Sequence, residues 1–171
     1  MNREQLEQQV KGYGELPVMT EINLDNNNYS HADLSGGNFH KVSFKNCNLS
    51  GANLKECQFA ECDFTGANLR SANLNLTNFI KPKANDCDFS KATLNLTNFI
   101  EPTLIAANFT EASLNKCNFI EGEFNQAVFN NARLDFVSFI NGKFKNVNFS
   151  RVYFHRSAFI DPYFKEIKLI L

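Results

Sequence analysis

The sequence has no tryptophan, only three histidines, and no marked excess of charge of either sign. Its 17 basic and 18 acidic residues give a formal net charge of −1 over 171 residues. This balance gives no electrostatic reason to expect direct binding to nucleic acid or to an acidic membrane surface. Apolar runs stay well short of the roughly 20 residues that span a bilayer, and residues 1–8 lack the apolar stretch of a secretory signal. We therefore expect a cytoplasmic protein that does not enter membranes.

The five cysteines are odd in number and form no C-x-x-C pair. Histidine is too scarce and too distant from them to complete a zinc site. We therefore predict reduced, buried thiols, no disulfide framework and no metal site.

Phenylalanine is unusually common, with 18 copies, and it follows a strict period. From Leu34 to Leu169 every fifth residue is apolar, with the small residue Ala84 as the exception. A small or apolar residue lies two positions before each of them, and the residue between is most often Asn or Asp. Neither a helix nor an alternating strand has a period of five, so the pattern indicates a repeat architecture.

Residues 20 apart also share their character, which predicts four pentapeptides in each coil of a solenoid. The two clearest columns are Phe39, Phe59, Phe79, Phe99, Phe119, Phe139, Phe159 and Leu34, Leu54, Leu74, Leu94, Leu114, Leu134, Phe154. The cysteines fall in the small inward columns, where cysteine packs as a small hydrophobic residue. One coil cannot bury its apolar ring alone, but stacked coils bury a continuous column.

Several segments resemble the pentapeptide-repeat family, whose pattern is A-(D/N)-L-x-x. They are Ala52-Asn53-Leu54, Ala67-Asn68-Leu69, Ala72-Asn73-Leu74 and Ala107-Asn108-Phe109. The resemblance covers roughly residues 22 to 171 and implies an all-β fold, a right-handed parallel β-helix with four sides and the central Leu or Phe pointing inward. About seven coils spaced about 4.8 Å apart predict a rod about 34 Å long.

The N-terminal segment is expected to cap this rod. Residues 4–11 read as a short helix with Leu6 and Val10 one turn apart, ended by Gly12, Gly14 and Pro17. We therefore divide the chain into a cap, residues 1–21, and a β-helix, residues 22–171. The C-terminal end carries no comparable cap and is apolar.

Catalytic chemistry is not expected. His31, His40 and His155 lie on outward columns, and we expect none of them to have a stacked Asp and a Ser or Cys for a nucleophilic relay. A core filled with Phe leaves little room for a ligand pocket. We predict neither an enzyme nor a cofactor site.

The first candidate site is an exposed apolar stripe along one edge of the rod. It combines two outward columns, Ile80, Ile100, Ile120, Ile140, Ile160 and Leu76, Leu96, Phe136. Such stripes often mark interaction sites. The alternative is that β-branched residues simply suit a stacked ladder.

The second candidate site is the C-terminal end, where apolar residues would favour end-to-end packing of two rods as a homodimer. Its residues are Tyr163, Ile167, Leu169 and Leu171. The alternative is a frayed terminus.

Some members of the family resemble a DNA duplex, bind type II topoisomerases and protect gyrase from quinolones or toxins. A duplex carries one charge per about 1.7 Å, so a mimic of this length needs on the order of 20 negative charges. The net charge of −1 does not supply them, and the repeat has none of the inserted loops that some protecting members carry. We therefore predict a non-catalytic structural or protein-interaction module, with the DNA mimic as the alternative.

Overall fold

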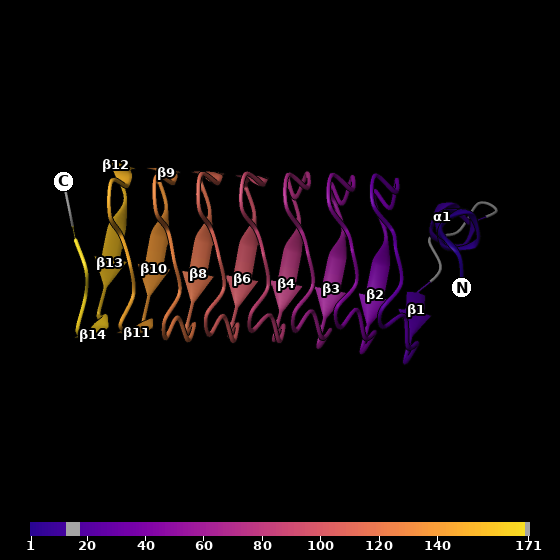
Figure 1. Ribbon diagram of the computed structural model, residues 1–171, viewed down its shortest axis with the longest axis horizontal. Helices are drawn as coiled ribbons and strands as arrows, with labels where there is room; N and C mark the ends of the chain where they lie inside the picture. The colour runs from indigo at the N-terminus through magenta and orange to yellow at the C-terminus, as the bar shows by residue number, and fades with distance from the viewer. Residues whose placement is uncertain (13–17, 170–171) are drawn as a thin grey trace.

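The computed structural model describes residues 1–12 and 18–169, which form a rod with helix α1 (Arg3–Lys11) at one end (Figure 1). The rest is a right-handed parallel β-helix, the hand that crossovers between parallel strands almost always take. Its strands are β1 (Val18–Thr20), β2 (Asn38–His40), β3 (Gln58–Ala60), β4 (Asn78–Ile80), β5 (Thr93–Asn95), β6 (Asn98–Ile100), β7 (Ser113–Asn115), β8 (Asn118–Ile120), β9 (Arg133–Asp135), β10 (Ser138–Ile140), β11 (Lys143–Lys145), β12 (Tyr153–His155), β13 (Ala158–Ile160) and β14 (Tyr163–Lys165).

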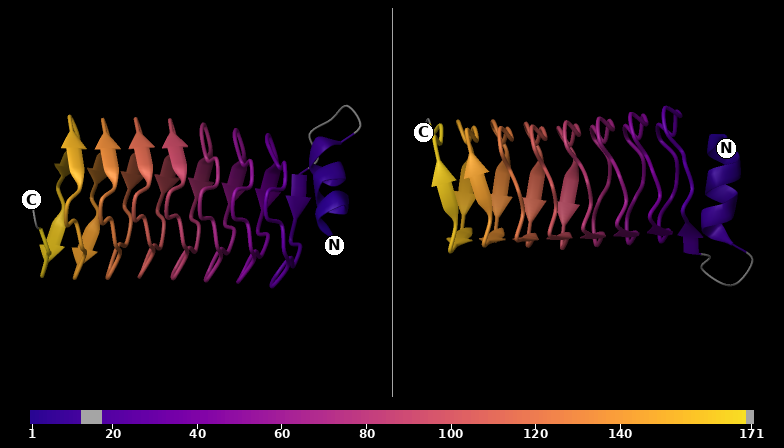
Figure 2. Two further views of the ribbon diagram at one scale, coloured as in Figure 1. Left: turned by 45° about the horizontal axis from the view of Figure 1, so that its top comes forward. Right: turned by 90° about the horizontal axis from the view of Figure 1, so that it is seen from below.

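Each coil has four walls, which the chain visits in order (Figure 2). The first, called here the eight-stranded wall, is a parallel sheet in the order β1-β2-β3-β4-β6-β8-β10-β13. The second wall contains the pair β11-β14, and the fourth contains the sheet β12-β9-β7-β5. The third wall, opposite the eight-stranded wall, is held by single bridges such as Asn68 to Asp88.

Neighbouring coils pair in register at an offset of 20 residues, as where Phe79 lies beside Phe99. The predicted four-sided solenoid with 20 residues per coil is therefore confirmed. Phenylalanine rings stack along the rod, with a centroid distance of 4.6 Å and an interplanar angle of 5° between Phe79 and Phe99. Rings on opposite walls meet edge to face across the core, as Phe109 and Phe119 do at 89°. Each such aromatic pair adds about 1 kcal/mol to the burial of the rings.

The corners of the coil explain why the period is five. Every fifth residue from Glu21 to Glu166 has a positive φ, and apart from Gly36, Gly51 and Gly66 these residues are not glycine. The left-handed conformation costs a non-glycine residue roughly 1–2 kcal/mol. It also turns the amide along the rod, so that Leu76 N donates to the carbonyl of Asn95 at 2.8 Å. The ladder between coils thus offsets the strain at the corners.

The Asn or Asp before the central residue has two tasks. Its side-chain oxygen accepts a hydrogen bond from the amide two residues later, as Asn68 Oδ1 does from Arg70 N at 3.0 Å. Where the residue is Asn, its amide group also donates to the coil before it, as Asn68 Nδ2 does to Asn48 Oδ1 at 3.3 Å. These bonds fix the turn locally and tie successive coils together.

Helix α1 covers the first coil, as the sequence predicts, and buries Leu6 and Val10 against it. Asn2 forms a capping box with Gln5 at the start of the helix. The end of the helix is tied down where Lys11 Nζ lies 3.2 Å from Asp33 Oδ2. A hydrogen bond from the Ser35 hydroxyl, followed by hydrogen bonds from Lys11 and from the Ser35 backbone, lowers the pKa of the Asp33 carboxyl to about 2.

The β-helix begins earlier than the predicted boundary at residue 22. Strand β1 already pairs with β2, Met19 beside Phe39, because the repeat pattern extends to Met19. The helix-ending residues Gly14 and Pro17 lie outside the described residues.

Candidate interaction surfaces

The isoleucine column runs along one edge of the eight-stranded wall. Ile80, Ile100, Ile120, Ile140 and Ile160 are the last residues of β4, β6, β8, β10 and β13, and they stack directly on one another. The two outermost are the most exposed, at 41% for Ile80 and 46% for Ile160. The inner three are half-buried because each lies between isoleucines of adjacent coils.

The geometry of the strands does not require isoleucine at this position. Strands β5, β7, β9 and β12 on the fourth wall have the same length and extended form. They end instead in Asn95, Asn115, Asp135 and His155. The preference of a stacked ladder for β-branched residues therefore does not account for five successive isoleucines.

The second apolar column lies elsewhere than predicted. Leu76, Leu96 and Phe136 are exposed, but they precede the strands of the eight-stranded wall, whereas the isoleucines end them. Four residue steps along the chain separate the two columns, a distance of up to about 13 Å. The prediction of one merged apolar stripe is therefore wrong, because the two columns form opposite edges of a single wall.

A polar ladder fills the middle of this wall. Asn98 Nδ2 donates to Asn78 Oδ1 at 2.8 Å, and Asn118 Nδ2 donates to Asn98 Oδ1 at 2.9 Å. Their amide groups are largely used within the ladder. The wall thus has a hydrogen-bonded centre with an apolar column along each edge.

Charged residues lie along both edges of the eight-stranded wall. The column before the strands, called here the entry column, reads Leu76, Leu96, Lys116, Phe136, Arg156. The corner after the isoleucines, called here the exit corner, reads Lys81, Glu101, Glu121, Asn141, Asp161. Lys81 Nζ lies 3.3 Å from Glu101 Oε2. Among the described residues, Lys116, Glu121, Arg156 and Asp161 make no ion pair.

The C-terminal end of the rod is open. Strands β12, β13 and β14 are each the last strand of their sheet. A hollow of about 500 Å³ there is lined by Phe149, Phe154, Ser157, Phe159, Phe164, Ile167 and Leu169. Of the predicted end residues, Tyr163 and Leu169 are 60% and 57% exposed and Ile167 is half-buried. Leu171 lies outside the described residues.

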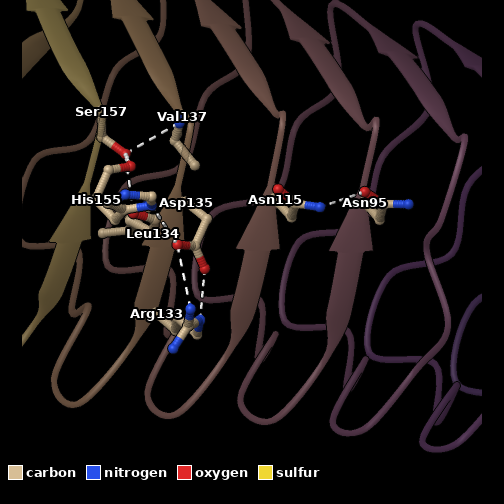
Figure 3. Close-up of polar contacts among 8 residues, drawn as sticks. All are labelled: Asn95, Asn115, Arg133, Leu134, Asp135, Val137, His155 and Ser157. Carbon is tan, nitrogen blue, oxygen red and sulfur yellow. Dashed lines mark hydrogen bonds and ion pairs between the residues drawn. The ribbon is translucent and has the colours of Figure 1, made fainter.

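A polar cluster on the fourth wall was not expected from the sequence (Figure 3). Asp135 accepts from Arg133 and lies 3.1 Å from His155 Nδ1 on the next coil. The Arg133 guanidinium also stacks on the Tyr153 ring at 4.7 Å. His155 therefore has a stacked Asp, which was not identified from the sequence. The 20-residue spacing of Asp135 and His155 was the signal that could have found this pair.

This cluster does not form a nucleophilic relay. Ser157 Oγ donates to the carbonyl of Leu134 at 2.9 Å and accepts from Val137 N at 3.0 Å, so it is engaged with backbone (Figure 3). No hydrogen bond between Ser157 and the His155 ring occurs in the part of the chain that the structure describes.

The cysteines, the potential metal ligands and the helix offer no further candidate site among the described residues. All five cysteines are buried and unpaired, and burial raises the pKa of the Cys57 and Cys62 thiols to about 12. Within residues 1–12 and 18–169, no three His, Cys, Asp or Glu side chains gather as a metal site would require. Over the same residues no helix has the length and apolar character needed to cross a membrane.

Comparison with known families gives two matches that together span most of the rod. The family model described as a pentapeptide repeat region matches residues 52–129. The model described as pentapeptide repeats (8 copies) matches residues 19–57 and 112–151. No curated protein sequence matches the chain.

Two solved structures illustrate the likeness. A trypsin-treated variant of QnrB1, a plasmid-mediated fluoroquinolone resistance protein, has a TM-score of 0.54 and 22% identity, covering 90% of this chain and 84% of that one. HetL, involved in heterocyst differentiation regulation in the cyanobacterium Nostoc sp. strain PCC 7120, has a TM-score of 0.38 and 17% identity, covering 98% and 94%. At such identities the likeness concerns the fold alone.

Proposed function

The chain belongs to the pentapeptide-repeat family, and from this premise we propose that it is a non-catalytic interaction module whose eight-stranded wall binds a protein partner. The isoleucine column carries this proposal. Five stacked isoleucines occupy a position that holds Asn, Asp or His on the fourth wall, so their presence calls for a reason beyond ladder geometry. An exposed apolar column on a polar surface is typical of an interaction site.

The wall is also suited to binding because it is pre-organised. Its strands are held in register by backbone bonds and by the Asn78–Asn98–Asn118 ladder, so that binding orders few groups. A surface fixed before binding loses little conformational entropy on association. The mixed charges along both edges would then favour some partners over others.

A catalytic function has little support. The core is filled by stacked phenylalanines, and the Asp135–His155 pair faces no free nucleophile among the described residues. Association with a partner therefore accounts better for the stacked isoleucines of the wall than a reaction does for the histidines.

The DNA-mimic alternative rests on the shared fold with QnrB1 and is disfavoured by charge. The exit corner alternates Lys81 with Glu101 and Glu121, and the entry column carries Lys116 and Arg156. A duplex mimic needs a continuous acidic surface. Quinolone inhibition of gyrase in the presence of the purified chain tests it, and we expect no protection.

We also propose that the C-terminal end is covered by a second copy. Helix α1 closes the other end of the described rod, so an end-to-end contact between two chains would join their C-terminal ends about a two-fold axis. The edge strands β12, β13 and β14 and the apolar hollow support this proposal.

Site-specific photocrosslinking tests the binding wall. A photoreactive residue replaces Asn98, at the centre of the eight-stranded wall, or Asn108, at the equivalent ladder position of the opposite third wall. We expect a protein adduct from position 98 and none from position 108. Equal adducts from both positions, or adducts from position 108 alone, would contradict the proposal.

A further inference from the structure

We propose that the partner of the eight-stranded wall is a second copy of the same chain, packed side by side with its rod parallel to the first. This inference rests on the proposed function of the wall and names its occupant. It concerns a different surface from the C-terminal end, because it uses the length of the rod rather than its tip.

The two-fold symmetry of the proposed dimer brings the two edges of the wall together. A two-fold axis parallel to the rod, running between two facing walls, places the entry column of one copy against the isoleucine column of the other. Because the strands of this wall run across the rod, one to each coil, each level of one copy meets the same level of the other (Figure 1). In such a dimer, the residue at the entry edge of a coil meets the residues at the exit edge of the same coil in the second copy.

Three levels are apolar on both edges. Leu76 would meet Ile80 of the second copy, and the same relation holds for Leu96 with Ile100 and for Phe136 with Ile140. All three entry residues are exposed in the single chain. Pairing would remove both apolar columns from water at once.

The two other levels are matched in charge. Lys116 faces Ile120 and Glu121 of the second copy, and Arg156 faces Ile160 and Asp161. The aliphatic stem of each cation would cover an isoleucine while the charged end reaches the acid beyond it. None of these four side chains makes an ion pair in the described part of the single chain, where the Arg156 guanidinium lies 5.5 Å from the centre of the Phe136 ring, whereas Lys81 and Glu101 already pair with each other.

An antiparallel arrangement fits less well. Turning the second rod end for end about the level of Ile120 places Lys116 against Lys116 and Glu121 against Glu121. Like charges brought together in this way oppose association. The charge pattern therefore selects the parallel pair.

The contact is small, which sets the expected strength. Five coils about 4.8 Å apart give a strip about 24 Å long, and four residue steps along the chain give a width of up to about 13 Å. A standard interface buries about 800 Å² on each partner, well above this strip. At the preceding level Glu56 would meet Glu61, although Lys55 and His40 lie beside them at 2.9 and 3.8 Å. We therefore expect a weak, concentration-dependent dimer.

Disulfide trapping tests the register directly. In the variant Lys116→Cys, Glu121→Cys the two thiols of one chain are about 16 Å apart along the wall, beyond the reach of a disulfide. Thiols of two paired chains would meet. The control Gln126→Cys, Asn131→Cys places the same pair across the opposite third wall. The neighbouring native thiol of Cys117 is buried, and burial raises its pKa to about 11, so it reacts slowly.

Under mild oxidation we expect the first variant to form a covalent dimer of twice the monomer mass and the control to stay monomeric. Absence of this dimer at high protein concentration, or equal amounts from both variants, would overturn the inference. If the Asn98 photocrosslinker still captures another protein in that case, the wall binds a foreign partner and the proposed function stands. If neither experiment yields an adduct, both proposals fail.

A charge exchange gives a second readout that does not need oxidation. Sedimentation at low ionic strength should show the dimer weakened in Lys116→Glu and in Glu121→Lys, because each brings like charges together. The double variant Lys116→Glu, Glu121→Lys should recover the dimer. Single and double variants that all associate like the original chain would contradict the parallel pairing.

Discussion

The two ends of the rod place equivalent residues in opposite environments. Tyr29 and Leu169 occupy the same position on the third wall, yet Tyr29 is fully buried and Leu169 is 57% exposed. Helix α1 makes the difference, because Leu6 and Val10 close the first coil and no described element closes the last. Burial in a solenoid is therefore set by the neighbouring coil rather than by the repeat itself.

The middle coils are closed on both sides and carry all five thiols, which gives the first prediction. Burial holds these thiols neutral, with the pKa of Cys57 and Cys62 raised to about 12 and that of Cys47 and Cys117 to about 11. Thiols of the unfolded chain ionise near their ordinary pKa of 9.0. The free energy of unfolding should thus be unaffected below pH 9 and fall above it, by about 1.4 kcal/mol per thiol and pH unit.

Urea unfolding between pH 7 and 10 measures this effect. A Cys57→Ala, Cys62→Ala variant should lose less stability between these pH values than the original chain does. A loss of the same size in both proteins would show that the thiols are not its cause.

Replacing one phenylalanine in the middle of the rod and one at the open end compares how much each region contributes to stability. Phe109 is fully buried between Phe89 and Phe129, so Phe109→Ala should lower the free energy of unfolding by about 3–5 kcal/mol. Phe164 is 45% exposed; it meets Phe159 edge to face, and along the rod the described residues place a ring, that of Phe144, on one side of it only. Phe164→Ala should cost about 1 kcal/mol or less, and equal losses in urea unfolding would contradict the comparison.

Weakening the cap should make the N-terminal end resemble the open one. Leu6→Ala should lower stability by about 2 kcal/mol, whereas the exposed Gln9→Ala should change it little. Hydrogen exchange should quicken mainly in β1 and β2. Uniform quickening along the rod would argue against a local cap.

The smallest effect on stability is expected at the C-terminal end. The pair Ile167→Glu, Leu169→Glu lies on the rim of the open hollow and should cost about 1 kcal/mol or less. It should nevertheless abolish end-to-end association, because charge would enter an apolar contact. Light scattering over a concentration series measures the mass of both proteins. A double variant that dimerises at the same concentrations as the original chain would contradict association through the C-terminal end.

The sequence was sufficient to predict the architecture because its constraints repeat. The period of five follows from one left-handed corner per pentapeptide, and the period of 20 follows from Phe stacking on Phe. The surface was harder to predict because outward residues are not constrained by packing. Leu76 and Ile80 were assigned to one stripe because their spacing gives no indication that a whole wall lies between them. The Arg133–Asp135–His155 cluster was missed because it joins two coils and depends on side-chain geometry.

The most direct test of the binding wall is the affinity for the partner that photocrosslinking at position 98 identifies. Ile100→Lys, Ile120→Lys adds two charges to the eight-stranded wall, and Thr110→Lys, Asn130→Lys adds them at the same coil position on the opposite wall. Titration by calorimetry should show binding lost in the first variant and kept in the second. Binding kept by both variants, or lost equally by both, would contradict a function carried by the eight-stranded wall.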